Sequence, residues 1–329
     1  MSKDSEPHFD REGFLKKHND IRLKEKVEKI EKRDPDFWTN LEKIRSHYLR
    51  SISGYKSKLS LIINEISQAD INKPTIHSIR YRVKDTDSLL VKIIEKSDLV
   101  PEKPQGNPEI EKYRHLTPDN YYKIITDLVG VRILIRYRYQ WKAVHDLIWE
   151  LYHNDDREYI RDWEAEYINN PGLKFIAEQP RAYVKLDSDR STYEAIGKNI
   201  FHILTSENHY ASLHYLVNLG GTYVELQVRT IFDEAWCECN HDFVYKARVN
   251  SASAKKNLER LSIILAQHTT ASEEIVSLMC DIANPPRRKP RLKSHTEEKT
   301  QQDTGKSSKT FAFIRQRALL LSQQNNSSV

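Results

Sequence analysis

Residues 212–229 read SLHYLVNLGGTYVELQVR and carry the clearest fold signal in the chain. Two runs of alternating apolar and polar residues flank Gly220 and Gly221, a pattern typical of a β-hairpin with a two-residue turn. With that turn, His214 pairs with Gln227 across the hairpin, and one face becomes apolar. The other face then carries Ser212, His214, Glu225, Gln227 and Arg229.

This polar face has two interpretations. Any two-layer sheet exposes one polar face to water, so the residues could simply be solvated. Surface strands usually carry a loose mixture of Lys, Thr and Glu, whereas this set is more typical of a binding or catalytic site. The hairpin alone leaves the two interpretations evenly balanced.

Further strands and helices are predicted upstream and downstream of the hairpin. Residues 128–137, LVGVRILIRY, are apolar enough for a buried central strand, and residues 76–83 predict another strand. Apolar residues recur at steps of three and four from 38 to 66, which indicates one long amphipathic helix. Further helical patterns cover residues 88–96, 141–152, 230–245 and 254–283. The predicted class is α+β, a mixed sheet flanked by helices, with a long N-terminal helix and a C-terminal helical segment.

The predicted domain organisation places one folded region between two charged ends. Residues 1–36 form a charged extension whose segment 12–33 is expected to be an exposed helix. The folded domain covers 37–250, with a variable insert at 153–205, and a helix follows at 251–284. Residues 285–329 have the composition of a disordered basic tail, within which 311–321, FAFIRQRALLL, is a candidate docking helix for a protein partner.

Composition excludes several classes of protein. No apolar run approaches the ~20 residues that a membrane helix needs, and three cysteines without a CxxC pair favour a reducing compartment. We therefore expect a soluble, cytoplasmic protein without membrane contact. The net charge is +5, and residues 287–293 alone contain five basic residues, so the rest of the chain is formally balanced. Broad nucleic-acid binding is therefore not indicated for the folded region.

The first group of candidate functional residues is Arg82, Lys84, Ser88 and Lys92, at the end of a strand and the start of a helix. Lys84, Ser88 and Lys92 are four residues apart and share one helix face. Asp85, Thr86 or Asp87 would cap the helix, whose free amides and positive end suit a polyphosphate. The alternative is a solvated basic face, which this spacing alone favours.

The second group is Asp127, Arg132 and Arg136, around the predicted central strand. An acid at the mouth of a buried strand suits magnesium, which prefers carboxylate and phosphate oxygens. Arg132 and Arg136 share a strand face and could meet one ligand. Asp127 has the opposite parity, so it must precede the strand, or Gly130 must permit a bulge. The alternative is an exposed acid at a helix-to-strand junction.

Two further possibilities concern the flanks of the hairpin. Tyr210 precedes it and could stack on a purine, although a tyrosine there is more often a core-edge residue. His241-Asp242 follows it, but the other ligands of a metal-dependent phosphohydrolase have no recognisable segment. Cys237 and Cys239 lie in a helix without an assigned base, so a cysteine nucleophile is not expected.

In order, RVKDTDSLLVK, DLVGVRILIRY, YASLHYLV and VELQVRTIFDEAWCECNHDFVYK resemble the synthetase domain of the RelA/SpoT family, over residues 38–246. The chain lacks the hydrolase and regulatory halves of the large members, so it resembles a small alarmone synthetase. The resemblance implies a fold related to nucleotidyltransferases and a magnesium cofactor.

The resemblance also implies roles for individual residues. The ATP-binding residues would be Arg82, Lys84, Ser88, Lys92 and Arg132, with Arg136 added by strand parity. Asp127 and Glu225 would be the catalytic, magnesium-associated acids. The acceptor-binding residues would be Tyr210, Ser212, His214, Gln227, Arg229 and Lys246.

The implied reaction is transfer of pyrophosphate from ATP to the 3′-hydroxyl of GDP or GTP. His209 and Ala211 depart from the family pattern, which has a glycine before the tyrosine and a basic or amide residue after it. Two alternatives therefore stay open: a toxin-type enzyme that modifies the 3′ end of tRNA, and an inactive nucleotide-sensing or RNA-binding module. The sequence also leaves open a homo-oligomer and does not distinguish GDP from GTP.

Overall fold

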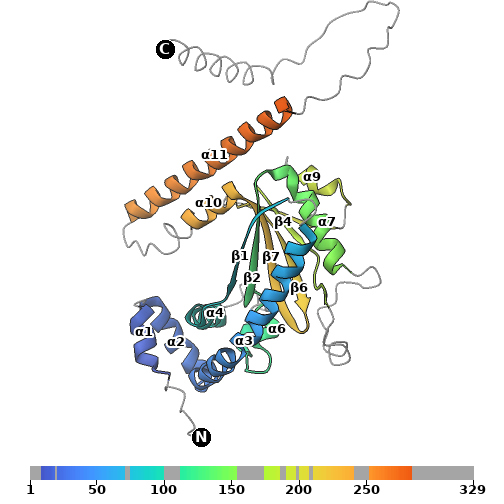
Figure 1. Cartoon of the computed structure of the whole chain (residues 1–329). Helices are drawn as coiled ribbons and strands as arrows, with labels where there is room; N and C mark the ends of the chain where they lie inside the picture. The colour runs from blue at the N-terminus through green and yellow to red at the C-terminus, as the bar shows by residue number, and fades with distance from the viewer. Residues whose placement is uncertain are drawn as a thin grey trace, which may run out of the picture. The chain divides into compact units, whose positions relative to one another are not determined.

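The computed structural model describes residues 9–18, 21–70, 75–99, 112–153, 174–185, 190–197, 200–206, 210–240 and 252–283. They build a seven-stranded mixed sheet with strand order β1-β2-β7-β6-β4-β5, and β3 also pairs with β6. Helices flank the sheet, as Figure 1 shows. The predicted α+β class is confirmed.

The described helices are α1 (Arg11–His18), α2 (Ile21–Arg33), α3 (Phe37–Asp70), α4 (Thr86–Asp98), α6 (Tyr121–Ile124), α7 (Trp141–Tyr152), α9 (Arg190–Glu194), α10 (Ile231–Asn240) and α11 (Ala252–Ala283). The described strands are β1 (Ile76–Val83), β2 (Val129–Ile135), β3 (Lys174–Ile176), β4 (Arg181–Val184), β5 (His202–Thr205), β6 (Ser212–Leu219) and β7 (Thr222–Thr230). No helix in these ranges is long and apolar enough to cross a membrane.

The β6–β7 hairpin has the predicted register. His214 pairs with Gln227, and the turn residues Gly220 and Gly221 have φ angles of 54° and 81°. Both positive angles are typical of a type I′ turn and explain why glycine stands at both positions. The same register places Glu225 and Gln227 on one face of β7.

Strand β2 lies between β1 and β7, antiparallel to the first and parallel to the second. Val129, Val131 and Ile133 are fully buried, as predicted for a central strand. The strand begins at Val129, and its register with β7 is continuous through Gly130. Asp127 therefore precedes the strand, and no bulge is needed at Gly130.

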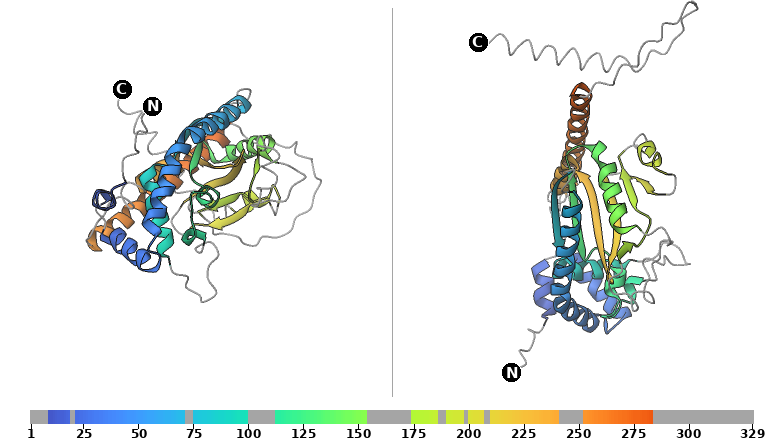
Figure 2. Two further views of the ribbon diagram at one scale, coloured as in Figure 1. Left: turned by 90° about the horizontal axis from the view of Figure 1, so that it is seen from below. Right: turned by 45° about the vertical axis from the view of Figure 1, so that its right-hand side comes forward.

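Helices α3 and α7 contact each other and cover one face of the sheet (Figures 1 and 2). The apolar stripe predicted for residues 38–66 is the buried side of α3, where Tyr48 and Ile62 are fully buried. Tyr48 also donates a hydrogen bond of 2.5 Å to the main-chain carbonyl of Lys84. This contact fixes the junction between β1 and α4 relative to the core.

The N-terminal segment differs from its prediction. Residues 12–33 were expected to form one exposed helix, but the structure has two helices, α1 and α2, and α2 packs against α4. Leu23, Val27 and Ile30 are almost fully buried in the main core. Their spacing of three and four residues is enough for a narrow buried stripe despite the many charges between them.

The segment predicted as a variable insert, 153–205, supplies β3, β4 and β5, which extend the sheet beyond β6. These strands are only three or four residues long, so they carry little alternation. The residues 154–173 within it, and the whole predicted tail 285–329, lie outside the described residues.

Candidate active site

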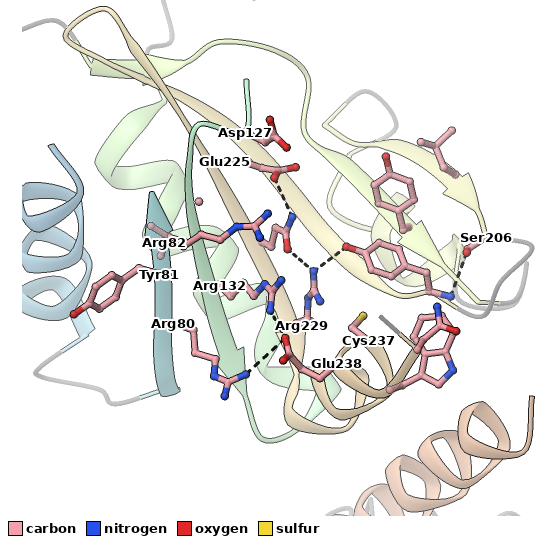
Figure 3. Close-up of a pocket in the computed structure, with 18 of the residues that line it drawn as sticks. Arg80, Tyr81, Arg82, Asp127, Arg132, Ser206, Glu225, Arg229, Cys237 and Glu238 are labelled. Carbon is pink, nitrogen blue, oxygen red and sulfur yellow. Dashed lines mark hydrogen bonds and ion pairs between the residues drawn. The ribbon is translucent and has the colours of Figure 1, made fainter. Parts of the chain in front are cut away.

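A cavity of about 920 Å³ opens on the sheet face that carries the polar side chains of β1, β2 and β7. Its described lining comes from these strands, from β4 and β5, from Tyr210 just before β6, and from α10. Seven predicted site residues line it: Arg82, Asp127, Arg132, Tyr210, Glu225, Gln227 and Arg229. Figure 3 shows that residues far apart in the sequence converge here.

Asp127 and Glu225 lie next to each other at one end of the cavity (Figure 3). Strand pairing explains this position, because Glu225 pairs with Gly130 on the neighbouring parallel strand and Asp127 precedes that strand. The two charges interact, since Asp127 raises the pKa of Glu225. Neither carboxylate points into the apolar core.

Two lysines hold Asp127. Lys84 donates to Asp127 Oδ2 at 2.9 Å, and Lys92 Nζ lies 2.9 Å from Oδ1. Burial raises the pKa of Asp127, but the charges of Lys92 and Lys84 outweigh burial and leave the pKa below its usual value. Lys84 precedes the first residue of α4, so it does not lie on a helix face with Lys92 as predicted. Both ammonium groups are nevertheless directed at Asp127, which stays ionised.

Glu225 is held by its strand neighbours. The Nδ1 atom of His214 lies 3.0 Å from Glu225 Oε1, and Gln227 Nε2 donates to Oε2 at 3.0 Å. Burial raises the pKa of Glu225. The hydrogen bond and charge of His214, together with the hydrogen bond from Gln227, outweigh burial and leave the pKa below its usual value. This carboxylate is also ionised at neutral pH.

Arg82 differs from the other arginines of the cavity. It is exposed, it lies opposite Gly130, and the described residues supply no ion pair to it. Arg132 and Arg229 are instead bound by acids of α10. Arg82 is therefore the cavity guanidinium that a ligand could engage without first displacing a carboxylate of the described residues.

Glu234 of α10 was missed by sequence analysis. Only 4% of this residue is exposed, and it accepts hydrogen bonds from Arg229 at 3.0 Å, Arg132 at 2.9 Å and Arg80 at 3.1 Å. Arg132 also donates to Glu238 at 2.5 Å. Glu234 and Glu238 are one turn apart on the helix that follows the hairpin. Two acids at this spacing, in a region with several arginines, were the sequence feature that could have predicted the ion-pair network.

Tyr210 is tied to the same network through its hydroxyl. Its oxygen lies 2.7 Å from His214 Nε2 and accepts from Arg229 Nη2 at 2.9 Å, and Arg229 also donates to Gln227. The guanidinium lies 5.3 Å from the centre of the tyrosine ring. Burial raises the pKa of Tyr210 to about 12, so the phenol stays protonated.

Some predicted residues lie outside the cavity lining. Ser88 is exposed, and its amide and hydroxyl bond to Asp85, which is the observed cap of α4. Ser212 is buried, with its hydroxyl 3.3 Å from the carbonyl of Val228. Arg136 is exposed beyond the end of β2. Lys246, predicted to bind the acceptor, lies outside the described residues.

The donor set at the mouth of β2 fits magnesium. Asp127 and Glu225 are neighbouring ionised carboxylates, and Mg²⁺ is typically held by one or two carboxylates plus substrate phosphates. In the described part of the chain there is no cluster of three or more His, Cys, Asp or Glu side chains, as a site made entirely of protein ligands would need. The residues therefore suit a metal that arrives with a phosphorylated substrate.

Comparison with known sequences decides the family. The family described as "Region found in RelA / SpoT proteins" matches residues 81–250, from within β1 to beyond α10. The chain belongs to the RelA/SpoT family. The matched RelA/SpoT region contains Asp127, Glu225 and the whole β6–β7 hairpin. No curated protein matches the chain.

Several solved structures are similar to this RelA/SpoT chain at low identity. Small alarmone synthetase 1 from Bacillus subtilis bound to its product pppGpp is 17% identical, with a TM-score of 0.44 over 72% of this chain and 98% of that one. A GTP pyrophosphokinase family protein from Streptococcus pneumoniae is also 17% identical, with a TM-score of 0.42 over 74% of this chain and 93% of that one.

Proposed function

We propose that the chain transfers the β,γ-pyrophosphate of ATP to the 3′-hydroxyl of GDP or GTP. One observation carries the proposal: Asp127 and Glu225 lie together at the end of a cavity whose wall also presents Arg82. Family membership supports it, and the similar proteins include a synthetase bound to pppGpp. The finer choice between GDP and GTP is part of the proposal.

The donor end of the cavity is the mouth of β2. Arg82 would bind a phosphate of ATP directly, because it projects into the cavity without an ion pair from the described residues. Lys84 and Lys92 surround Asp127 and would add positive charge where the triphosphate lies. Positioning and electrostatic stabilisation are the main sources of acceleration in phosphoryl transfer, and we expect the same of pyrophosphoryl transfer.

The acceptor end would lie along β7 and Tyr210. Tyr210, Gln227 and Arg229 line this side of the cavity, and His214 orients Glu225 from the neighbouring strand. The purine of the acceptor would stack on the tyrosine ring, and its 3′-hydroxyl would approach Glu225. Lys246, which the resemblance places in the acceptor region, lies outside the described residues.

The chemical step uses Glu225 as the base. The 3′-oxygen forms a bond to the β-phosphorus of ATP, the bond between that phosphorus and the α–β bridging oxygen breaks, and AMP leaves with that oxygen. The 3′-hydroxyl proton passes to the Glu225 carboxylate, which is ionised and therefore able to accept it. A magnesium ion held by Asp127 and Glu225 would neutralise charge on the polyphosphate.

Product analysis tests the proposal. Purified full-length protein is incubated with magnesium, γ-labelled ATP and one acceptor at a time: GDP, GTP, ATP, 3′-deoxy-GTP or tRNA. We expect labelled ppGpp or pppGpp from GDP or GTP, with equimolar AMP, and no product from 3′-deoxy-GTP. Absence of AMP and of labelled product from a folded, ATP-binding sample would contradict the proposal and favour an inactive nucleotide-binding module.

The acceptor panel also separates the two possible enzymes. Label transferred to tRNA, and not to GDP or GTP, would show that the cavity serves a nucleic-acid acceptor. Ala211 is buried and is not among the described residues that line the cavity, so this departure from the family pattern gives no support to a tRNA acceptor. GDP or GTP therefore remains the proposed acceptor.

A further inference from the structure

A second cleft lies between the middle of α3, the short helix α6 and the turn of the β6–β7 hairpin. It has a volume of about 680 Å³, and none of its described lining residues also lines the candidate active site. Residues 47, 51, 54 and 58 of α3 line it at steps of four, three and four, so they form one face of that helix. The cleft is therefore a space of its own, with one wall formed by a single helix face.

The lining of this cleft is basic. Arg50, Lys58 and Lys123 belong to it together with His47, and the described part of the lining includes no Asp or Glu. The three basic residues come from two helices, α3 and α6, so the fold and not a local run of charge brings them together. A concave surface that carries cations without acids raises the local concentration of anions.

Lys58 carries a charge that its surroundings do not balance. Its half-buried ammonium group donates to the carbonyl of Gly220 and to Thr222 Oγ1, the second at 2.8 Å, and both acceptors are neutral. Burial lowers the pKa of Lys58, as expected for a desolvated cation without a carboxylate beside it. The two hydrogen bonds tie α3 to the hairpin turn, but they use two of three donors and leave the charge for an anion to compensate.

Gly54 opens the wall between two of these cations. It lies inside α3, where glycine destabilises a helix relative to alanine, and a Cβ atom there would meet no atom within 4 Å. Packing therefore does not require a glycine at this position. Gly54 is four residues from both Arg50 and Lys58, so its missing side chain lets a ligand approach the helix backbone between them.

We propose that this cleft binds the phosphate group of a small molecule, which lies over Gly54 and is held by Arg50, Lys58 and Lys123. Phosphate fits this lining because its oxygens accept several hydrogen bonds at once and its charge balances more than one cation. The group is either an inorganic anion or a phosphate monoester. The remainder of an ester would lie against His47 and Tyr122, whose rings are within 18° of parallel. The proposal is independent of the proposed function.

Acylation of individual lysines tests the proposal, because it separates this cleft from the active site. The full-length protein reacts with acetic anhydride at about pH 8, where part of each lysine is neutral, and mass spectrometry gives the rate at each lysine. At orthophosphate ten times above the dissociation constant, Lys58 should react about 10-fold more slowly. Lys56, an exposed lysine outside the cleft lining, should keep its rate. Sodium chloride at equal ionic strength should protect neither lysine.

AMP in place of orthophosphate identifies the source of the phosphate group. Protection of Lys58 by AMP at a lower concentration than by orthophosphate supports a monoester whose ring contacts the aromatic side chains. Protection by orthophosphate at an equal or lower concentration supports the free anion. Failure of both to protect Lys58 overturns the proposal.

Two variants with the same added charge provide the matched comparison. Gly54→Glu places a carboxylate four residues from both Arg50 and Lys58, so it should remove the response of Lys58 to phosphate and raise the melting temperature. Ser57→Glu adds the same charge to an exposed position with Ser53 and Leu61 four residues away, and should keep the response. Arg50→Gln should raise the half-protecting phosphate concentration about 10-fold.

The remaining outcomes overturn the proposal. Lys58 of the wild type would be protected equally by chloride, or folded Gly54→Glu would keep the full response to phosphate. Equal loss of the response in Ser57→Glu and Gly54→Glu would likewise show that general charge, and not a site in the cleft, controls the reaction. Circular dichroism confirms that each variant is folded.

Discussion

Gly130 of β2 and Glu225 of β7 are direct partners in the parallel pairing of the two strands. Arg82 of β1 lies opposite the same glycine on its other side. Residue 130 therefore lies between the guanidinium of Arg82 and the proposed base, and its missing side chain leaves space on the floor of the cavity. This relationship explains why a glycine stands there although its backbone conformation does not require one.

Substitution of Gly130 tests that explanation. A Cβ atom there would lie 3.9 Å from Arg82 Cγ, an ordinary contact, so Gly130→Ala should fold normally and keep activity within about threefold. Gly130→Leu would fill the space between Arg82 and Glu225 and should lower kcat/KM about 100-fold with an unchanged melting temperature. Equal activity of the two variants would show that substrate does not occupy this floor.

Two substitutions of Tyr210 distinguish a stacking role of its ring from a hydrogen-bonding role of its hydroxyl. Tyr210→Phe keeps the ring beside Arg229 but removes the hydroxyl that contacts His214. If the ring stacks on the acceptor base, Phe should keep the acceptor KM within about threefold and Ala should raise it about tenfold or more. The KM for ATP should change little in either variant. A similar loss in both would assign the role to the hydroxyl.

Glu234 should be the structural anchor of the arginines. It is almost fully buried and pairs with Arg229, of which 4% is exposed, so Glu234→Gln leaves a buried cation without its counter-ion. We expect a loss of about 3 kcal/mol in the free energy of unfolding. Glu238→Gln removes a half-exposed partner of the same network and should cost under about 1 kcal/mol. Urea denaturation of the two variants compares them directly.

The buried His145 should make the free energy of unfolding depend on pH in the acid range. Burial lowers its pKa to about 4, and its Nδ1 atom lies 2.9 Å from the hydroxyl of the buried Tyr215. The unfolded chain binds the proton near pH 6.5, so the neutral histidine contributes stability above that pH and loses it as pH falls towards 4. The loss should approach about 3 kcal/mol. A His145→Gln variant should show a shallower fall in stability across this window, and an unchanged slope would contradict the assignment.

The sequence predicted the parts of the fold that local pattern determines. The hairpin pairing of His214 with Gln227 followed from its glycine turn, and the buried strand at 128–137 followed from its apolar content. It did not reveal β3, β4 and β5, because strands of three or four residues are defined by their distant partners and not by alternation. The burial of α2 was not predicted, because most of its residues are charged and only three aliphatic residues form its buried side.

The candidate site was predictable where residue type and strand parity agree. Asp127, Glu225, Gln227 and Arg229 were found because they stand on or beside recognisable strands. Glu234 was missed because a buried acid on a helix looks like any exposed acid until its arginine partners are placed. Arg136 is an even number of residues from Arg132, which on one strand would place both side chains on the same face. Strand β2 ends at Ile135, so this alternation does not extend to Arg136.

The most direct test of the account compares ATP binding with AMP release in Glu225→Gln. This change keeps the shape of the side chain and an acceptor for His214 while removing the charge that takes the 3′-hydroxyl proton. We predict ATP affinity within about threefold of wild type and a fall in AMP release with GTP of about 1000-fold. Wild-type AMP release by a folded Glu225→Gln protein would contradict the role of this carboxylate and, with it, the proposed active centre.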